Sequence, residues 1–263
     1  ADRHCMAWSP HFLTRLMVCN DGGLYQTDNL GVNYTYLSSG VAVTQMYRMG
    51  QSTTRPGYLV AGLQDNGMII CHAPTWTISI GGDGLDCAVD PSNDNYQYGS
   101  YVNGVIRRSN NAGANWGTIG QNGLNGITES GPWLTPYALN PANPNIMIAG
   151  YSSIWRTTNV KAFPPTFTNV NPLTGSSIRD ITFVDGNTAY ASRANGEFYQ
   201  SIDAGLTWTL KTNPPGGAAK DITGDPNNPQ NIWVASGNDV YKSIDGGTTW
   251  TIWDTGLPGI SCL

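Results

Sequence analysis

The stretch SIDAGLTW at residues 201–208 occurs again as SIDGGTTW at residues 243–250. Both copies share the pattern S-x-D-x-G-x-T-W, and their aligned glycines, Gly205 and Gly247, are 42 residues apart. A short segment of alternating apolar residues precedes each copy, which is typical of a strand that enters a tight turn. The sequence therefore predicts a unit of about 42 residues that is built around a repeated hairpin.

Weaker copies of the pattern lie upstream at similar spacing. They are TDNLGVNY at residues 27–34, SNNAGANW at residues 109–116, and a degenerate copy at residues 154–159 that is followed by Phe167. Near residue 72 the flanking strand-like segments remain but the turn pattern is lost. The repeat thus extends over the whole chain.

A second repeated element is an Asx-Pro turn, as in Asp90-Pro91, Asn140-Pro141 and Asp225-Pro226. Proline presets φ and the Asx side chain bonds the local backbone, so these pairs mark turns. Each unit then holds four short strands. This predicts an all-β fold, a β-propeller of four-stranded antiparallel blades, rather than a sandwich or a barrel. The expected blades lie near residues 3–42, 43–84, 85–132, 133–178, 179–218 and 219–258, and residues 259–263 resemble the first strand of another.

The ends of the chain show no spare strand that would lock the first blade to the last. We therefore expect residues 1–263 to be one propeller domain or a fragment of a longer protein. The first residues, ADRHCMAW, indicate a processed or partial chain.

Composition excludes several classes. The chain has 32 glycines, 16 prolines and only 12% charged residues, which disfavours helical bundles and coiled coils. No apolar run is long enough to span a membrane. A net charge of −5 argues against nucleic-acid binding. The five cysteines have no metal-ligand spacing, and their pairing is left open between disulfides and free thiols: Cys5, Cys19, Cys71, Cys87 and Cys262.

The repeated pattern resembles the Asp-box, or bacterial neuraminidase repeat, of sialidases, sortilin-type receptors, xyloglucanases and photosystem assembly propellers. The resemblance implies a propeller fold but no particular activity. Hydroxyl, carboxylate, glycine and tryptophan are each expected to stabilise the hairpin rather than to catalyse a reaction. The expected structural residues are Ser201, Asp203, Gly205, Trp208, Ser243, Asp245, Gly247, Trp250, Ser109, Asn111, Gly113 and Trp116. Trp76 is expected to fill the same place in the second unit.

A closer resemblance is carried by NDGGLY (20–25), LQDNG (63–67), GGDG (81–84) and GPWLTPYALNP (131–141). These strings look like those of large secreted bacterial Asp-box proteins that are exported by the type IX route. The resemblance implies an extracellular or cell-surface location.

Candidate site residues lie in the loops opposite the repeated turns. Asp21, Asp65, Asp83 and Asp86 come from loops of successive units and are expected to converge near the central channel. Converging carboxylates serve as acid and base in glycosidases or as ligands for a cation such as calcium. Trp133, Tyr47 and Tyr137 are placed to stack on sugar rings. The alternative is that these aspartates form turns, since Asp-Gly and Asn-Gly are common tight-turn sequences.

Xyloglucanases carry an acidic catalytic residue in a place similar to that of Asp21, but their second aspartate belongs to a second propeller. The Arg-Ile-Pro motif of sialidases is absent. His4, His11 and His72 have no ligand spacing and are expected to be structural or surface residues.

The sequence therefore favours a binding or scaffold module that engages a protein or a glycan outside the cell, with no cofactor. Two alternatives stay open. One is a glycoside hydrolase that uses the loop aspartates, and the other is a subunit of a surface filament or secretion-associated assembly, built from further copies or further domains.

Overall fold

The structure is a computed structural model that describes residues 3–20, 23–39, 44–171 and 175–256. Within these ranges it contains 24 strands, β1 to β24, and one short 3-10 helix, η1 (Val102–Gly104). The strands form six four-stranded antiparallel sheets in which each strand pairs with its neighbours in sequence. The predicted fold class, an all-β chain of repeated four-stranded units, is confirmed.

The first three sheets cover the N-terminal half. Sheet 1 contains β1 (Arg3–Trp8), β2 (Leu16–Asn20), β3 (Gly23–Thr27) and β4 (Thr35–Tyr36). Sheet 2 contains β5 (Met46–Gln51), β6 (Tyr58–Leu63), β7 (Gly67–His72) and β8 (Thr75–Ile80). Sheet 3 contains β9 (Cys87–Val89), β10 (Gln97–Tyr101), β11 (Val105–Ser109) and β12 (Gly117–Gly120).

The other three sheets follow the same order. Sheet 4 contains β13 (Tyr137–Leu139), β14 (Met147–Gly150), β15 (Ile154–Thr157) and β16 (Thr168–Asn171). Sheet 5 contains β17 (Ile178–Phe183), β18 (Ala189–Arg193), β19 (Phe198–Ser201) and β20 (Thr209–Lys211). Sheet 6 contains β21 (Ala219–Asp225), β22 (Asn228–Ser236), β23 (Asp239–Ser243) and β24 (Thr251–Ile252). Residues 259–263, expected to begin another blade, lie outside the described residues.

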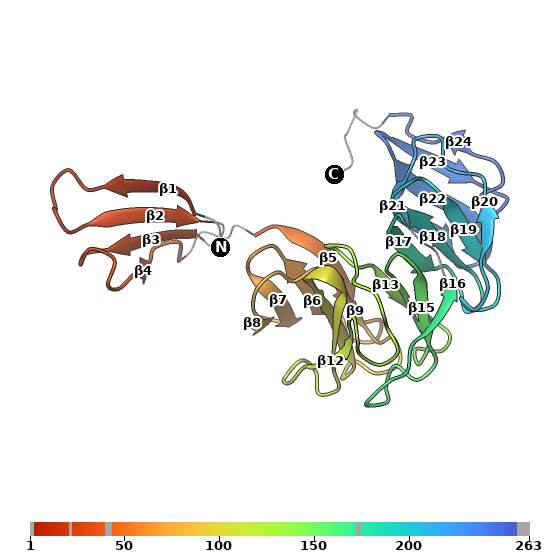
Figure 1. Cartoon of the computed structure of the whole chain (residues 1–263), viewed down its shortest axis with the longest axis horizontal. Helices are drawn as coiled ribbons and strands as arrows, with labels where there is room; N and C mark the ends of the chain where they lie inside the picture. Colours follow the sequence, from red (N-terminus) through yellow and green to blue (C-terminus); the bar gives the residue numbers. More distant parts are fainter. Residues whose placement is uncertain (1–2, 21–22, 40–43, 172–174, 257–263) are drawn as a thin grey trace.

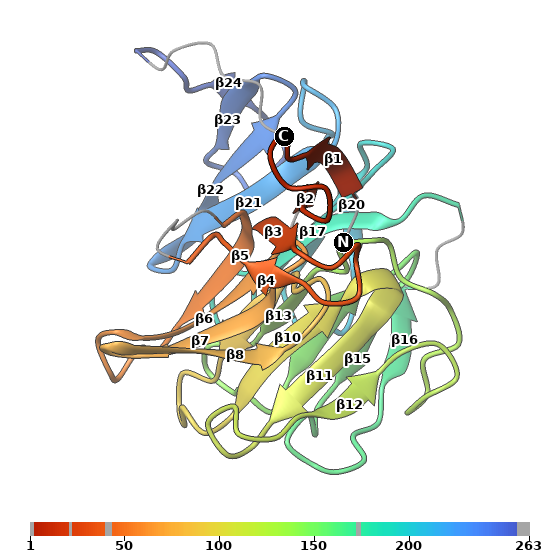
Figure 2. The same ribbon diagram turned by 90° about the vertical axis from the view of Figure 1, so that its left-hand side faces the viewer.

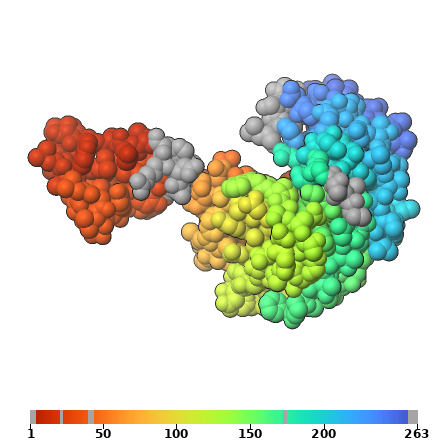
Figure 3. Space-filling model, in the orientation of Figure 1, coloured from red at the N-terminus to blue at the C-terminus, as the bar shows by residue number. Residues whose placement is uncertain are grey.

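Sheets 2 to 6 stand side by side in an arc, with the first strand of each sheet at the inner edge (Figure 1). Sheet 1 stands apart from the arc in Figure 1, and in the view of Figure 2 it lies in front of the other sheets. The space-filling view shows the same separation and the hollow inner side of the arc (Figure 3).

The hydrophobic core lies between the sheets. Four clusters of buried side chains each join two consecutive sheets, from sheets 2 and 3 through to sheets 5 and 6. Met68 and Cys87 belong to one of them, and Phe198 and Ile222 to another. None of the four clusters of described residues draws on β1 to β4. Packing of one sheet face on the next is therefore what stabilises the arc.

Two glycines allow sheets 2 and 3 to approach closely. A Cβ atom on Gly62 would lie 2.0 Å from the carbonyl oxygen of Leu85, and one on Gly50 would lie 2.7 Å from the Cα atom of Ala88. Any side chain at Gly62 would collide with neighbouring backbone, so glycine is required there by the packing.

The hairpin between the third and fourth strands has the same hydrogen bonds in five of the six sheets. We call it the repeat turn, and it begins at Thr27, Ser109, Thr157, Ser201 and Ser243. In each, this hydroxyl donates to the side-chain oxygen of an Asp or Asn two residues later, at 2.7–2.9 Å. In four of them the glycine N–H donates back to the hydroxyl oxygen. These local bonds close the turn without help from other sheets.

Asp203 shows how fully a repeat turn satisfies its carboxylate. Oδ1 accepts the N–H groups of Leu206 and Thr207 at 3.1 and 2.8 Å, and Oδ2 accepts the Thr207 hydroxyl at 2.6 Å. Although partial burial would raise it, these bonds lower the pKa of Asp203. The carboxylate is therefore held by its own turn.

Trp76 departs from its expected role. The indole N–H of Trp116 donates to Gly113 O and that of Trp208 donates to Gly205 O. Sheet 2 has no repeat turn, because β7 and β8 are joined through Ala73-Pro74. Without a turn glycine to bond, Trp76 is left 52% exposed.

Cys5 and Cys19 do lie opposite each other in the pairing of β1 with β2, but both are free thiols, as are Cys71 and Cys87. The Cys87 thiol is buried and donates to the carbonyl oxygens of Arg48 and Val60 in the preceding sheet. It packs as a small apolar side chain.

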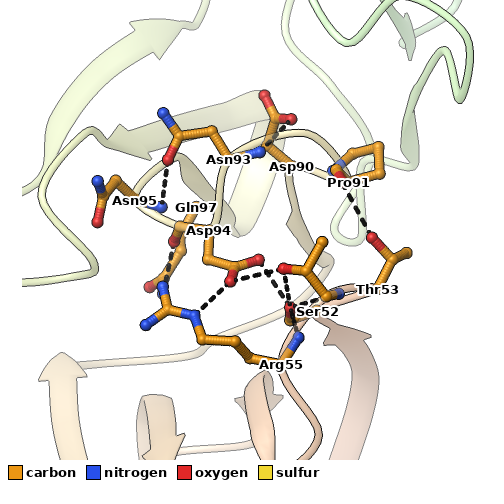
Figure 4. A network of polar contacts seen from close by, with 10 residues as sticks. Ser52, Thr53, Arg55, Asp90, Pro91, Asn93, Asp94, Asn95 and Gln97 are labelled. Carbon is orange, nitrogen blue, oxygen red and sulfur yellow. Dashed lines mark hydrogen bonds and ion pairs between the residues drawn. The ribbon is translucent and has the colours of Figure 1, made fainter.

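The Asx-Pro turn of sheet 3 is attached to sheet 2 by Asp94 (Figure 4). Its carboxylate accepts the Ser52 hydroxyl at 2.7 Å and the Thr54 hydroxyl at 3.0 Å, and it forms an ion pair with Arg55. Burial alone would raise the pKa of Asp94, but these bonds outweigh it and lower the pKa. Side chains therefore fasten this turn of sheet 3 to sheet 2.

Candidate functional site

Three inner strands carry a charged residue at the same place in the sheet register. Arg48 in β5, Asp180 in β17 and Asp221 in β21 each follow an irregularity in the pairing with the second strand. A bulge of this kind redirects the side chain that follows it. The repeat thereby brings equivalent positions of three sheets to the same end of the inner edge.

The Arg48 guanidinium joins these positions. It contacts the Asp221 carboxylate at 2.8 Å and the Asp180 carboxylate at 3.4 Å, so sheet 2 reaches sheets 5 and 6 across the hollow of the arc. Asp86, directly before β9, is near enough for its charge to act on Arg48. We call these residues the inner cluster: Arg48, Asp86, Asp180 and Asp221.

Two carboxylates of the inner cluster also bind the backbone of the next sheet. Asp180 Oδ2 accepts the N–H of Ile222 in sheet 6 at 2.8 Å, and Asp86 Oδ2 accepts the N–H of Tyr137 in sheet 4 at 3.1 Å. Ile222 and Tyr137 hold equivalent places in their inner strands. The same carboxylate-to-amide hydrogen bond therefore joins sheet 5 to sheet 6 and sheet 3 to sheet 4.

Burial dominates the ionisation of these two acids. It raises the pKa of Asp180 to about 7, against the opposing charge of Arg48 and with a further increase from Asp221 and Asp86. It raises the pKa of Asp86 to about 6, against the hydrogen bond from Tyr137 N–H and the charge of Arg48. Both acids therefore change charge close to neutral pH.

Arg48 responds in the opposite sense. Burial alone would lower the pKa of Arg48, but the negative charge of Asp180 and the hydrogen bond to Asp221 raise it. Its side chain is 30% exposed and that of Asp221 is 59% exposed, whereas Asp180 is 9% exposed. A visiting molecule would thus meet the guanidinium and the Asp221 carboxylate first.

The structure gives the predicted loop aspartates different partners. Asp83 Oδ1 accepts the backbone N–H of Asp65 at 3.0 Å, and Asp65 itself has a left-handed backbone with φ of 57°. These two residues tie the β6–β7 loop to the segment before β9. Asp86 belongs to the inner cluster instead, and Asp21 lies outside the described residues.

The predicted aromatic residues are also dispersed. Tyr137 is buried, and its hydroxyl donates to the carbonyl oxygen of Asp86 at 3.1 Å. Tyr47 is half-buried in β5, and Trp133 is 52% exposed in the loop before β13.

In the described residues no group of three or more His, Cys, Asp or Glu is arranged to hold a metal ion. No helix in that part of the chain has the length and hydropathy needed to cross a bilayer.

The acids of the inner cluster are held by contacts within the chain. Glycosidases need two carboxyl groups about 5–10 Å apart that are free to reach the substrate and a water molecule. Here Asp86 and Asp180 each accept a backbone N–H, and Arg48 bridges Asp180 to Asp221. The paired side chains of Arg48 and Asp221 are the more exposed members of the cluster, at 30% and 59%.

Sequence reasoning missed Arg48, Asp180 and Asp221. One signal was present: the tripeptide Asp-Ile-Thr occurs at residues 180–182 and again at 221–223, at the repeat spacing. Recurrence of a charged residue at the head of an inner strand indicates a shared position. The equivalent position in sheet 2 has Arg48 instead of an aspartate, so only the structure relates it to Asp180 and Asp221.

Comparisons with solved structures agree on the architecture. The chain is similar to an ancestral GH74 enzyme, with TM-score 0.61 and 14% identity over 95% of this chain and 37% of that one. It is similar to YCF48 from Cyanidioschyzon merolae, with TM-score 0.59 and 14% identity over 97% and 85% of the two chains. The fold is a β-propeller.

Two further propellers match at the same identity. The GH74 xyloglucanase from Xanthomonas campestris gives TM-score 0.62 over 94% of this chain and 44% of that chain. YCF48 bound to D1 peptide gives TM-score 0.56 over 95% and 80%. This propeller therefore spans less than half the length of the two GH74 enzymes. No family model and no curated protein matches the sequence.

Proposed function

We propose that this propeller is a binding module of an extracellular or cell-surface protein and that it holds a protein partner at the inner cluster. The observation that carries the proposal is the use of the carboxylates. Asp83 accepts a loop N–H, while Asp86 and Asp180 accept amides of the next sheet, which leaves Arg48 and Asp221 to meet a ligand.

A peptide suits this pair because it offers both carbonyl or carboxylate acceptors and N–H donors. A guanidinium forms strong charge-assisted bonds to the acceptors, and a carboxylate accepts from the donors. The likeness to YCF48 bound to D1 peptide supports a protein partner over a glycan. The repeat turns, with their shared hydrogen bonds, support membership of the Asp-box propellers.

The proposal is tested with a peptide array and a glycan array, each probed with the wild type, Arg48→Met and Asp221→Asn. We expect peptide hits that weaken at least tenfold in both variants. Asp221→Asn keeps the test valid if Arg48→Met fails to fold, since Asp221 is exposed. Arg179→Met, which removes an exposed charge from β17, is the matched control and should bind like the wild type. Peptide hits unchanged by both variants, or glycan hits alone, would overturn it.

A glycoside hydrolase is the second candidate, because the GH74 propellers share the fold and a carboxyl with a pKa of about 7, as in Asp180, suits a general acid. Release of reducing ends from xyloglucan oligosaccharides, abolished by Asp180→Asn, would establish that function. Because we favour the binding module, we expect the wild type to release reducing ends no faster than the Asp180→Asn variant does.

A further inference from the structure

Two arginines hold equivalent positions in neighbouring sheets. Arg108 in β11 and Arg156 in β15 each lie one residue before the hydroxyl residue of a repeat turn. In the sheet register, Arg108 lies between Tyr98 and Gly117, and Arg156 lies between Ile148 and Thr168. The chain thus offers two versions of one site, and their surroundings can be compared directly.

The Arg108 site is filled by the next sheet. Its guanidinium donates to the carbonyl oxygens of Val160 and Ala162, the latter at 2.6 Å. The rings of Phe163 and Tyr96 lie 5.7 and 5.8 Å from its central carbon, within cation–π range. Arg108 is 7% exposed as a result. A stretch of peptide with a carbonyl at Ala162 therefore binds this arginine, and the ring of the next residue, 72% exposed, lies at its edge.

The Arg156 site keeps only the first of these contacts. Its Nε donates to the carbonyl oxygen of Ala204 at 2.8 Å, and Ala204 holds the place in its repeat turn that Val160 holds in the preceding one. The repeat turn of sheet 4 is longer than that of sheet 5, because residues 160–166 separate Asn159 from Phe167. Sheet 5 passes from Ala204 to Gly205 without such a segment, so nothing replaces Ala162 and Phe163.

A groove of about 260 Å³ lies where that segment would be. Its walls include Arg156, Thr158, Thr166, Thr168, Val170 and Leu206. The volume is below that of a typical drug-sized pocket, about 300–1,000 Å³, and suits a few residues of extended chain. Arg156 is half-buried, and this burial lowers its pKa. The guanidinium has therefore lost part of its water without gaining a full set of hydrogen-bond acceptors.

We propose that the groove beside Arg156 binds an extended peptide segment of a partner protein, whose main-chain carbonyl meets the guanidinium and whose next side chain is aromatic. The segment at residues 160–166 is the internal example of such a ligand. This site is on the third and fourth strands, whereas the inner cluster is on the first strands. The inference therefore goes beyond the proposed function and is tested separately from it.

The chemistry of the groove favours a neutral carbonyl over an anion. The Asp203 carboxylate is close enough for its charge to raise the pKa of Arg156, so it would repel a sulfate or a uronic acid. At the equivalent Arg108 both acceptors are neutral main-chain carbonyls. The two sites differ beside the aromatic residue. A Cβ atom at Gly117 would lie 3.2 Å from the Phe163 ring, and the groove has Thr168 at the place of that glycine, so its side chain narrows the space for an aromatic ring.

The test uses the whole chain and a capped peptide NVKAFPPT, which copies residues 159–166. Calorimetric or NMR titration should show weak but saturable binding, as expected for a contact of a few residues. Arg156→Met should weaken binding at least tenfold, and Thr168→Gly should tighten it several-fold. A peptide with alanine in place of phenylalanine should bind at least tenfold more weakly, and Arg179→Met should leave binding unchanged.

Arg156→Lys covers the case in which Arg156→Met does not fold. It keeps a donor for Ala204 but lacks the planar fork, and it should also lose binding. Retained peptide binding in Arg48→Met separates this site from the inner cluster. No saturable binding to the wild type, equal binding by the wild type and both Arg156 variants, or binding of an acidic oligosaccharide in place of the peptide would each overturn the proposal.

Discussion

Replacing Asp180 by asparagine tests the electrostatics of the inner cluster. The side chain of Asp180 is 9% exposed, and burial raises its pKa to about 7 from the ordinary value of 3.8. Between pH about 4 and about 7 the folded chain therefore holds a proton that the unfolded chain has released. A raised carboxyl pKa makes folding less favourable as pH rises through this window, so the wild type should lose stability from pH 5 to pH 8.

The size of the effect follows from the shift. A difference of about three pKa units at about 1.4 kcal/mol each gives an upper limit of roughly 4 kcal/mol between pH 4 and pH 8. About two of these units lie above pH 5, so we expect a loss of up to about 3 kcal/mol between pH 5 and pH 8. Asparagine keeps an oxygen for the Ile222 amide but cannot ionise. Asp180→Asn should therefore match or fall slightly below the wild type at pH 5 and be more stable at pH 8.

The assay is urea denaturation followed by tryptophan fluorescence at pH 5, 6, 7 and 8 and constant ionic strength. A smaller slope should persist in Asp180→Asn, because Asp86 has a pKa raised to about 6. Asp221→Asn, on the same guanidinium but 59% exposed, is the control and should keep most of the wild-type slope. A wild-type stability that is flat or rises from pH 5 to pH 8, or parallel slopes for wild type and Asp180→Asn, would refute the reasoning.

Three further predictions concern the fold. Gly62→Ala should lower the free energy of unfolding, measured by urea denaturation, by roughly 3 kcal/mol, because the new Cβ would lie 2.0 Å from Leu85 O. The control is Gly81→Ala, because Gly81 has open space around it. Ala204→Gly should raise the free energy of unfolding by about 0.5–1 kcal/mol and with it the melting temperature, because Ala204 has a φ of 59° at the place where sheet 6 has Gly246. An unchanged melting temperature would contradict strain at this turn. Lys161→Met should cost about 3 kcal/mol, because it strips the fully buried Asp90 carboxylate of an ion pair at 2.7 Å; a loss below 0.5 kcal/mol would mean that the pair is not formed.

The repeat turns could be predicted from the sequence because their bonds are local. In Ser201 to Thr207, hydroxyl, carboxylate and amide partners all lie within seven residues, so the pattern contains the whole interaction. The prediction for Trp76 is wrong because its unit lacks the repeat turn whose glycine carbonyl accepts the indole N–H of Trp116 and of Trp208. A local rule therefore fails where one member of the pattern is missing.

The inner cluster could not be predicted in the same way. Arg48 meets partners 132 and 173 residues away, and each contact depends on a bulge at the head of a different strand. Counting blades predicts the face on which the loop aspartates lie but not the direction of a side chain. Asp86 is one of the predicted residues, and its carboxylate accepts the N–H of Tyr137.

The exposure of equivalent residues in the inner strands could not be predicted from the repeat. Six apolar or aromatic residues hold one register position of the inner strands: Met6, Met49, Cys87, Tyr137, Ile181 and Ile222. The last four face a preceding sheet of the arc and are 4–6% exposed, whereas Met6 and Met49 are 60% and 57% exposed. The sequence pattern is the same in all six, so it predicts the type of side chain. Whether that side chain is buried depends on the neighbouring sheet, which no single repeat unit encodes.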